Sequence, residues 1–137
     1  MTRLEALEET ANRNWGTMSH AQMLAHCQKP LDVANENLVI KRSIVSYLFG
    51  SMMKKKLIDK GEDFKKNLPT VKEFKITSEL NFEIEKAISK AKIYELGQKR
   101  EVVIKVKTHP FFGKMSQVEW GVLLYKHLDH HFKQFGI

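Results

Sequence analysis

The chain has 137 residues, of which 23 are basic and 16 acidic, so its formal net charge is +7. A hydrophobic fraction of 42% excludes a disordered chain, and the length predicts one domain over residues 1–137. The longest uncharged segment, Asn14–Gln28, is shorter than the roughly 20 residues that a membrane span needs. The single cysteine, Cys27, excludes a disulfide framework and a zinc finger, and it suits a reducing compartment. Acidic residues close to the start predict that there is no secretory signal. We therefore expect a cytoplasmic protein without a membrane partner.

Two helices are predicted before residue 40. A short one covers residues 1–10, with Leu4 and Leu7 on one face. After a turn, Ser19 and Gln22 form the capping box S-x-x-Q, in which each side chain satisfies a backbone N–H of the other residue. The helix that follows carries an apolar stripe at helical spacing, formed by Met23, Leu24, Cys27, Leu31, Ala34 and Leu38.

A third helix is predicted over residues 43–59, with its apolar positions facing the core. These positions are Ile44, Tyr47, Leu48, Met52 and Leu57. Basic residues flank this helix, because residues 41–66 hold eight bases and three acids, which is +5 of the net +7. Such a segment is typical of a solvated face, and it also suits a membrane-surface helix, nucleic acid or an anionic small molecule. Nucleic acid is the weakest of these partners, because no helix with base-reading residues accompanies the segment.

A loop over residues 60–72 leads to a fourth helix, which Asn81 caps and Gly97 ends. The segment that follows, residues 102–106, is rich in β-branched side chains. It predicts a short strand that pairs with residues 74–76.

The last helix begins at a second capping box, formed by Ser116 and Glu119, and runs almost to Ile137. Helices joined by short and medium connections predict an all-α, up-down four-helix bundle, with a short strand-like insertion before the last helix. The first helix is too short to cover a whole bundle, so an apolar groove would stay open. We therefore expect a homodimer.

Three histidines, His127, His130 and His131, lie on the last helix. Because an α-helix turns by about 100° per residue, His127 and His131 share the apolar face and His130 lies roughly 80° from its centre. Two imidazoles one turn apart in a bundle interior either bind a shared metal ion or each need a buried hydrogen-bond partner. The H-x-x-x-H pattern is short and common, so the spacing leaves both alternatives open.

A metal site normally needs a third ligand, and His26 is the best candidate. It flanks the apolar stripe of the other well-capped helix. Pro30, four residues later, has no N–H and crowds the carbonyl of His26, so we expect a bend that turns the imidazole toward the core. The alternative is that His26 packs or forms a hydrogen bond where two helices meet.

The other histidines and the cysteine are weaker candidates for metal ligands or catalytic groups. We expect His20 to be exposed, and His109 to line a cavity mouth or to be exposed. Cys27 points about 100° away from His26 and is expected to be a small buried hydrophobe. The sequence contains no Gly-rich phosphate loop, no serine nucleophile elbow and no convincing carboxylate pair, which excludes the enzyme classes that depend on them.

Several motifs together resemble one family. They are WGTMS over residues 15–19, QMLAHC over 22–27, KKNLPT over 65–70, HPFFGK over 109–114, EWG over 119–121, YKHLDHH over 125–131 and QFG over 134–136. From Trp15 to the end, the chain resembles the DinB-like (damage-inducible) superfamily and, within it, a bacterial domain-of-unknown-function family. The resemblance implies an up-down four-helix bundle in which His26, His127 and His131 hold a divalent metal ion. Characterised relatives include metal-dependent thiol S-transferases and a thiol-dependent isomerase.

The histidine pattern and the resemblance lead to one functional hypothesis. Zinc or nickel in a three-histidine site keeps open positions, at which a low-molecular-weight thiol is held as thiolate for addition to an electrophilic small molecule. Hydrolysis by metal-activated water is the variant within the enzyme class. A metal-binding bundle without catalysis, kept for sensing or assembly, is the main alternative. A nucleic-acid-associated basic protein is a weaker one.

Overall fold

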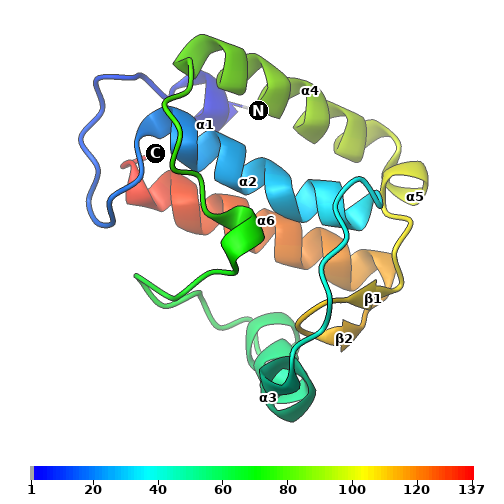
Figure 1. The fold of residues 1–137 in the computed structure, drawn as a ribbon. Helices are drawn as coiled ribbons and strands as arrows, with labels where there is room; N and C mark the ends of the chain where they lie inside the picture. The colour runs from blue at the N-terminus through cyan, green and yellow to red at the C-terminus, as the bar shows by residue number, and fades with distance from the viewer. Residues whose placement is uncertain (1) are drawn as a thin grey trace.

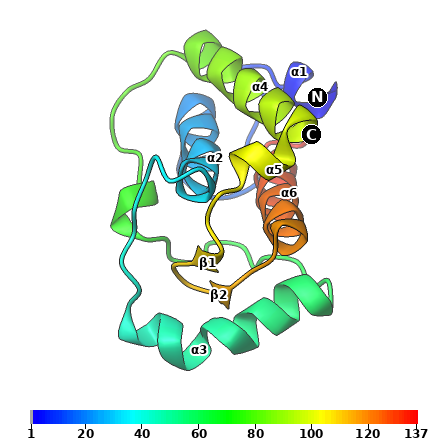
Figure 2. The same ribbon diagram turned by 90° about the vertical axis from the view of Figure 1, so that its right-hand side faces the viewer.

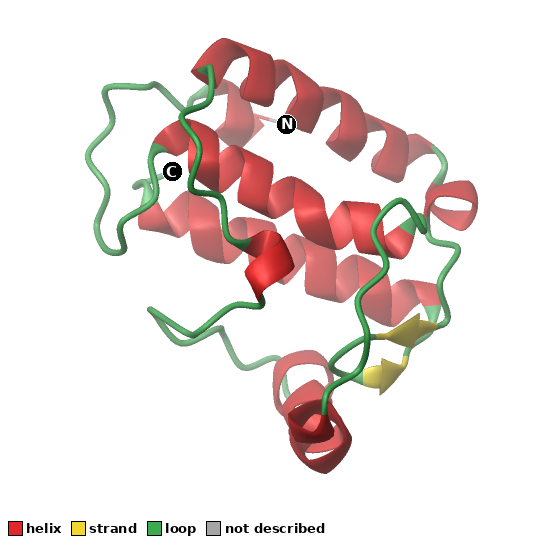
Figure 3. Cartoon of the chain, in the orientation of Figure 1, coloured by secondary structure: helices red, strands yellow, loops and turns green. Residues whose placement is uncertain are grey.

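The chain forms a bundle of helices in the computed structural model, which describes residues 2–137 (Figures 1 and 3). The helical elements are α1 (Thr2–Glu5), α2 (His20–Ala34), α3 (Ile44–Lys54), the π-helical turn η1 (Lys55–Asp59), the 3-10 turn η2 (Lys72–Phe74), α4 (Phe82–Gln98), α5 (Arg100–Val103) and α6 (Gln117–Gln134). Two short strands, β1 (Thr108–His109) and β2 (Gly113–Lys114), pair in antiparallel fashion before α6. The structure thus confirms an all-α bundle with a short strand-like insertion before the last helix.

Three long helices build the bundle. α2 contacts both α4 and α6, and α3 lies across one end of them, beside β2 (Figure 2). Two apolar clusters fill the interior, and both contain residues of α2 and α6. One includes Leu31, Trp120 and Leu124, and the other includes Leu24, Phe132 and Phe135. The stretches of α2 and α6 between these clusters are therefore held at both ends.

The helix starts agree with the predicted caps. The Ser19–Gln22 and Ser116–Glu119 capping boxes are both present, with each side chain bonded to the backbone of the other residue. The side chain of Asn81 accepts a hydrogen bond from the backbone N–H of Ile84 at the start of α4. These caps satisfy backbone donors that a helix start otherwise leaves without partners.

The first helix is shorter than predicted, because α1 ends at Glu5; the predicted start at Met1 lies outside the described residues. Its two leucines nevertheless reach the core. Leu4 and Leu7 are buried against the cluster that contains Phe132 and Phe135. Part of the groove from which we inferred a homodimer is therefore filled by the chain itself, and the homodimer stays a prediction.

The predicted core face of the third helix is wrong over α3, whereas Leu57, which lies in η1, is buried as expected. Ile44 and Leu48, expected inside, are 79% and 69% exposed, whereas Ser46 is 2% exposed. The reason lies at Gly50, where an added Cβ would come within 1.9 Å of the carbonyl oxygen of Phe111. The helix docks through this close backbone contact, which only the face with small side chains allows.

The predicted strand over residues 102–106 is also wrong. Its first residues belong to α5, and the backbone N–H groups of Lys105 and Val106 then donate to the carbonyl oxygen of Ala34. A β-branched segment is therefore used to satisfy a carbonyl at the end of α2 rather than to form a sheet. Across residues 2–137, no helix is both long and apolar enough to cross a lipid bilayer.

Candidate metal centre

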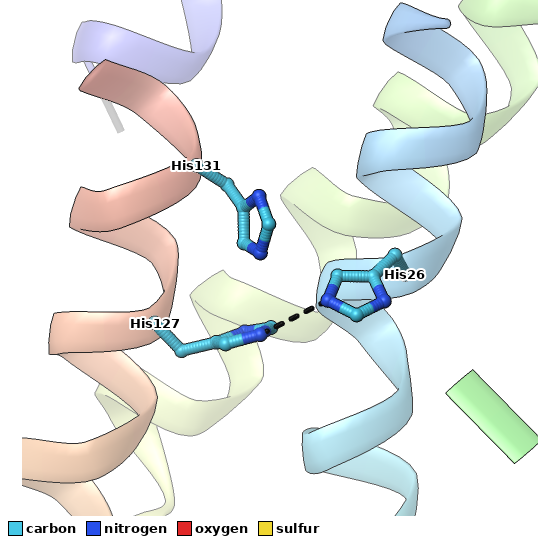
Figure 4. A group of neighbouring side chains, drawn as sticks. All are labelled: His26, His127 and His131. Atoms are coloured by element: carbon cyan, nitrogen blue, oxygen red, sulfur yellow. Dashed lines mark hydrogen bonds between the residues drawn. The ribbon is translucent and has the colours of Figure 1, made fainter. Parts of the chain in front are cut away.

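Three histidines from two helices meet in the bundle. Each of His26 on α2 and His127 and His131 on α6 offers one ring nitrogen, and these three atoms lie within 4.8 Å of one another. Figure 4 shows the three rings directed toward one another across the space between the helices. Nε2 of His26 and Nε2 of His127 are 3.1 Å apart. The structure thus brings together the three residues that we predicted as ligands.

The packing of the rings follows from the helix spacing. His127 and His131 are one turn apart on α6, with ring centroids separated by 4.7 Å. The ring of His26 is nearly equidistant from them, at 4.9 Å from His127 and 4.7 Å from His131. His26 and His131 are buried, and His127 is partly exposed.

A backbone hydrogen bond orients His26. Its Nδ1 lies 2.9 Å from the carbonyl oxygen of Phe74 in η2. A carbonyl oxygen only accepts, so Nδ1 of His26 carries a proton, and in the neutral ring Nε2 presents its lone pair to the other two histidines. Residues 74–76 were expected to pair in a sheet, so no sequence signal pointed to this contact.

Gln134 orients His131 in the same way. The Nε2 amide of Gln134 donates to the carbonyl oxygen of Trp15 at 2.8 Å, which turns its Oε1 toward Nδ1 of His131, also at 2.8 Å. Nδ1 of His131 is therefore the protonated nitrogen, and its Nε2 is free to bind. Gly16, in the left-handed region at φ +79°, allows this approach, because a Cβ there would be 2.3 Å from the Gln134 amide. Sequence reasoning missed Gln134 as a functional residue, although it lies in the QFG motif.

Burial keeps the three imidazoles neutral. It lowers the pKa of His26, and it lowers the pKa of His127 well below its ordinary value, with a further contribution from His131. Burial and the neighbouring His26 lower the pKa of His131 to about 4. All three side chains are therefore in the neutral form that binds metal ions at pH 7.

The donor set and its spacing fit a tetrahedral ion. Bonds of about 2.1 Å at tetrahedral angles place ligand nitrogens about 3.4 Å apart. The Nε2 atoms of His26 and His127 are already close to this separation, at 3.1 Å. Because Nε2 of His26 has no proton, the contact is a hydrogen bond donated by Nε2 of His127. Metal binding therefore requires His127 to carry its proton on Nδ1 instead.

The other histidines lie outside this group. His130 faces the rings of Trp15 and Phe64, with centroids at 5.5 and 5.9 Å. The expectation that His20 is exposed is wrong, because its Nε2 donates to the carbonyl oxygen of Ala11 at 2.7 Å and its ring is partly buried. Burial raises the pKa of the Cys27 thiol, which agrees with the expected role as a small buried hydrophobe.

His109 has a structural role in the turn between β1 and β2. Its Nδ1 accepts hydrogen bonds from the backbone N–H groups of Phe111 and Phe112, at 3.0 and 3.1 Å. Burial and the nearby Arg42 lower its pKa from 6.5 to about 3. The unfolded chain binds the proton more readily, so the contribution of His109 to stability is full above pH 6.5 and is lost as the pH falls toward 3. His109 is partly buried in this turn and lies outside the histidine trio.

The fold and the site define an all-α helical bundle with a cluster of three neutral imidazoles between two of its helices. No family model, no curated protein and no solved structure matches the chain. The interpretation of the site therefore depends on the geometry of this chain and on the motifs in its sequence.

Proposed function

We propose that the chain binds one divalent metal ion, zinc or nickel, through His26, His127 and His131. One observation carries this proposal: three neutral imidazoles offer ligand atoms within 4.8 Å of one another. Two of these rings have their Nδ1–H groups held by Phe74 and Gln134, which is the arrangement typical of metal-binding histidines. Imidazole nitrogen suits both zinc and nickel.

The DinB-like resemblance extends this proposal to an enzyme, a metal-dependent thiol S-transferase that acts on electrophilic small molecules. His26, His127 and His131 would leave a coordination position open on a bound ion, and the positive charge of the ion would favour the thiolate form of a thiol bound there. The thiolate sulfur then forms a bond to an electrophilic carbon, and the leaving group departs with the bonding electron pair. The thiol proton passes to solvent or to a base.

Two side chains near the trio favour a substrate thiol that carries a negative charge. The Lys66 amine lies 4.4 Å from the centre of the Trp15 ring, and that ring contacts His130. Lys66 thus places a positive charge near His130, whose ring is 5.1 Å from that of His131. The ring of Phe64 is 6.1 Å from that of His127 and meets it edge to face, so it adds an apolar surface beside the same ring.

The second candidate is a metal-binding bundle without catalysis. The burial of His26 and His131 favours it, because these side chains are only 4% and 8% exposed and leave little room for a substrate. In the part of the chain that the structure describes, the surface cavities beside Lys54 and Tyr125 are lined by other residues than the trio. In this case the ion serves assembly or sensing.

The test is elemental analysis of protein purified without an affinity tag, with alanine variants of the histidines on α6. We expect about one ion per chain, lost from His127→Ala and His131→Ala and kept by the matched control His130→Ala. Loss of one ligand should weaken binding by more than the 10–100-fold that removal of a hydrogen-bond partner costs. Equal metal content in all three variants would contradict the proposed site.

The two candidate functions differ in turnover. The metal-loaded protein is mixed with a low-molecular-weight thiol and a generic electrophile, and consumption of the electrophile is followed. Turnover that requires both the ion and the thiol supports the transferase. Bound metal without turnover across a panel of thiols supports the non-catalytic bundle.

A further inference from the structure

Among the described helices, α3 carries the most exposed large apolar side chains, and they form its outer face. Six large apolar side chains of this helix are exposed, namely Ile44, Val45, Tyr47, Leu48, Phe49 and Met52. Single exposed apolar residues are ordinary, but a contiguous group of them marks an interaction surface. α3 lies along the outside of one end of the molecule, where such a surface is accessible (Figure 2).

The contacts of α3 fix which face points outward. Its inner face uses Ser46, which is buried, and Gly50, whose backbone approaches the carbonyl oxygen of Phe111 so closely that no Cβ fits between them. Rotating the helix to bury Leu48 would bring a large side chain into this contact. The outward position of the apolar side chains is therefore a built feature of the fold.

Positive charges lie at both ends of this apolar face. Residues 41–60 contain six basic residues and one acidic residue. Lys41 precedes α3, and Lys55, Lys56 and Lys60 follow it, all of them exposed. Apolar side chains with lysines on either side are typical of helices that lie in the interface of a lipid bilayer, where the amines reach the phosphate groups.

The charge of this face argues against a second copy of the chain as its occupant. A two-fold contact through α3 would bring the same lysines of two chains together, and like charges repel.

We propose that α3 binds the chain to the surface of an anionic lipid bilayer, with its apolar side chains at the headgroup boundary and its flanking lysines on lipid phosphates. The contact is peripheral, so it needs no membrane-spanning helix. It replaces the expectation, drawn from the sequence, that the chain has no membrane partner. It does not depend on the proposed metal site, which lies on α2 and α6.

The test is co-sedimentation of the full chain with lipid vesicles. We expect binding to phosphatidylcholine vesicles that contain about 30% phosphatidylglycerol, and much weaker binding to phosphatidylcholine alone. Salt at about 0.5 M should weaken the binding to anionic vesicles, because it screens the lysines. No binding, or equal binding to both kinds of vesicle, would overturn the proposal.

Two pairs of substitutions test the apolar contact. Ile44→Ser combined with Leu48→Ser should reduce vesicle binding by at least about 10-fold, because two apolar groups no longer enter the interface. Val102→Ser combined with Val118→Ser is the matched control, since these valines are 63% and 65% exposed on other elements. The control should bind as the wild type does, and an equal loss in both pairs would contradict a specific role of α3.

The charge contact is tested in the same way. Lys55→Glu combined with Lys56→Glu should also reduce binding by at least about 10-fold. Lys75→Glu combined with Lys99→Glu changes the net charge equally at exposed positions in other parts of the chain and should have a smaller effect. The mass in solution completes the test: a dimer that Leu48→Ser dissociates, without any vesicle binding, would make α3 a subunit interface and overturn the proposal.

Discussion

Gly50→Ala is the sharpest test of how α3 is held. The new Cβ would meet the carbonyl oxygen of Phe111 at 1.9 Å and its carbon at 3.0 Å. Backbone atoms cannot rotate away as a side chain does, so we expect the upper end of the usual cost of overpacking, about 3 kcal/mol. Alanine is better than glycine inside a helix by about 1 kcal/mol. The net loss of unfolding free energy is therefore about 2 kcal/mol.

Gly97→Ala is the matched control, because no atom lies within 4 Å of an added Cβ at Gly97. The higher helix propensity of alanine should raise the free energy of unfolding by up to about 1 kcal/mol. Thermal unfolding resolves the difference, since 1 kcal/mol corresponds to about 3–5 °C for a domain of this size. The Gly50 variant should also expose the Lys54–Lys56 segment to trypsin. If both variants were stabilised, α3 would not dock through Gly50, and the fixed outer face would have no basis.

Three further outcomes are expected. Gln134→Leu removes the acceptor that holds the Nδ1–H of His131 and should lower metal affinity 10–100-fold in a chelator competition; an unchanged affinity would show that this hydrogen bond does not orient the ligand. His109→Asn should flatten the loss of stability between pH 6.5 and 3 by up to about 1.4 kcal/mol per pH unit, measured as denaturant unfolding across this range. Pro30→Ala should stabilise the metal-free protein by up to about 3 kcal/mol and weaken metal binding, if the proline sets the position of His26; equal metal affinity would make Pro30 a structural residue only.

The capping residues in the sequence correctly predicted where the long helices begin. Ser19 and Ser116 carry their capping boxes within four residues, so the information is contained in the segment itself. The orientation of α3 was not predictable in this way. Its periodicity indicates which side is apolar, but the inner side is decided by a turn more than 60 residues away, at Phe111. The prediction of a strand over residues 102–106 was wrong for a similar reason, because the hydrogen-bond partner of this segment is the carbonyl of Ala34 and not another strand.

The candidate site was predictable to different degrees. The i, i+4 spacing placed His127 and His131 on one face by helix geometry alone. His26 lies on a different helix, so it was selected by its place beside an apolar stripe and by the family motif. The groups that orient the rings, the carbonyl of Phe74 and the amide of Gln134, were not found. A backbone carbonyl carries no sequence signature, and a glutamine at the end of a helix is ordinary.

The distance along the chain between the ligands has a consequence for biosynthesis. His26 and His127 are 101 residues apart. A ribosome that adds 5–20 residues per second makes His127 roughly 5–20 s after His26, so the site cannot form until the whole segment between these two histidines has been made. A metal ion held here would join two distant segments as a disulfide does, and closing a loop of about 100 residues restricts the unfolded chain by as much as about 4.7 kcal/mol. Metal supply in the cell would then govern how long the newly made protein persists.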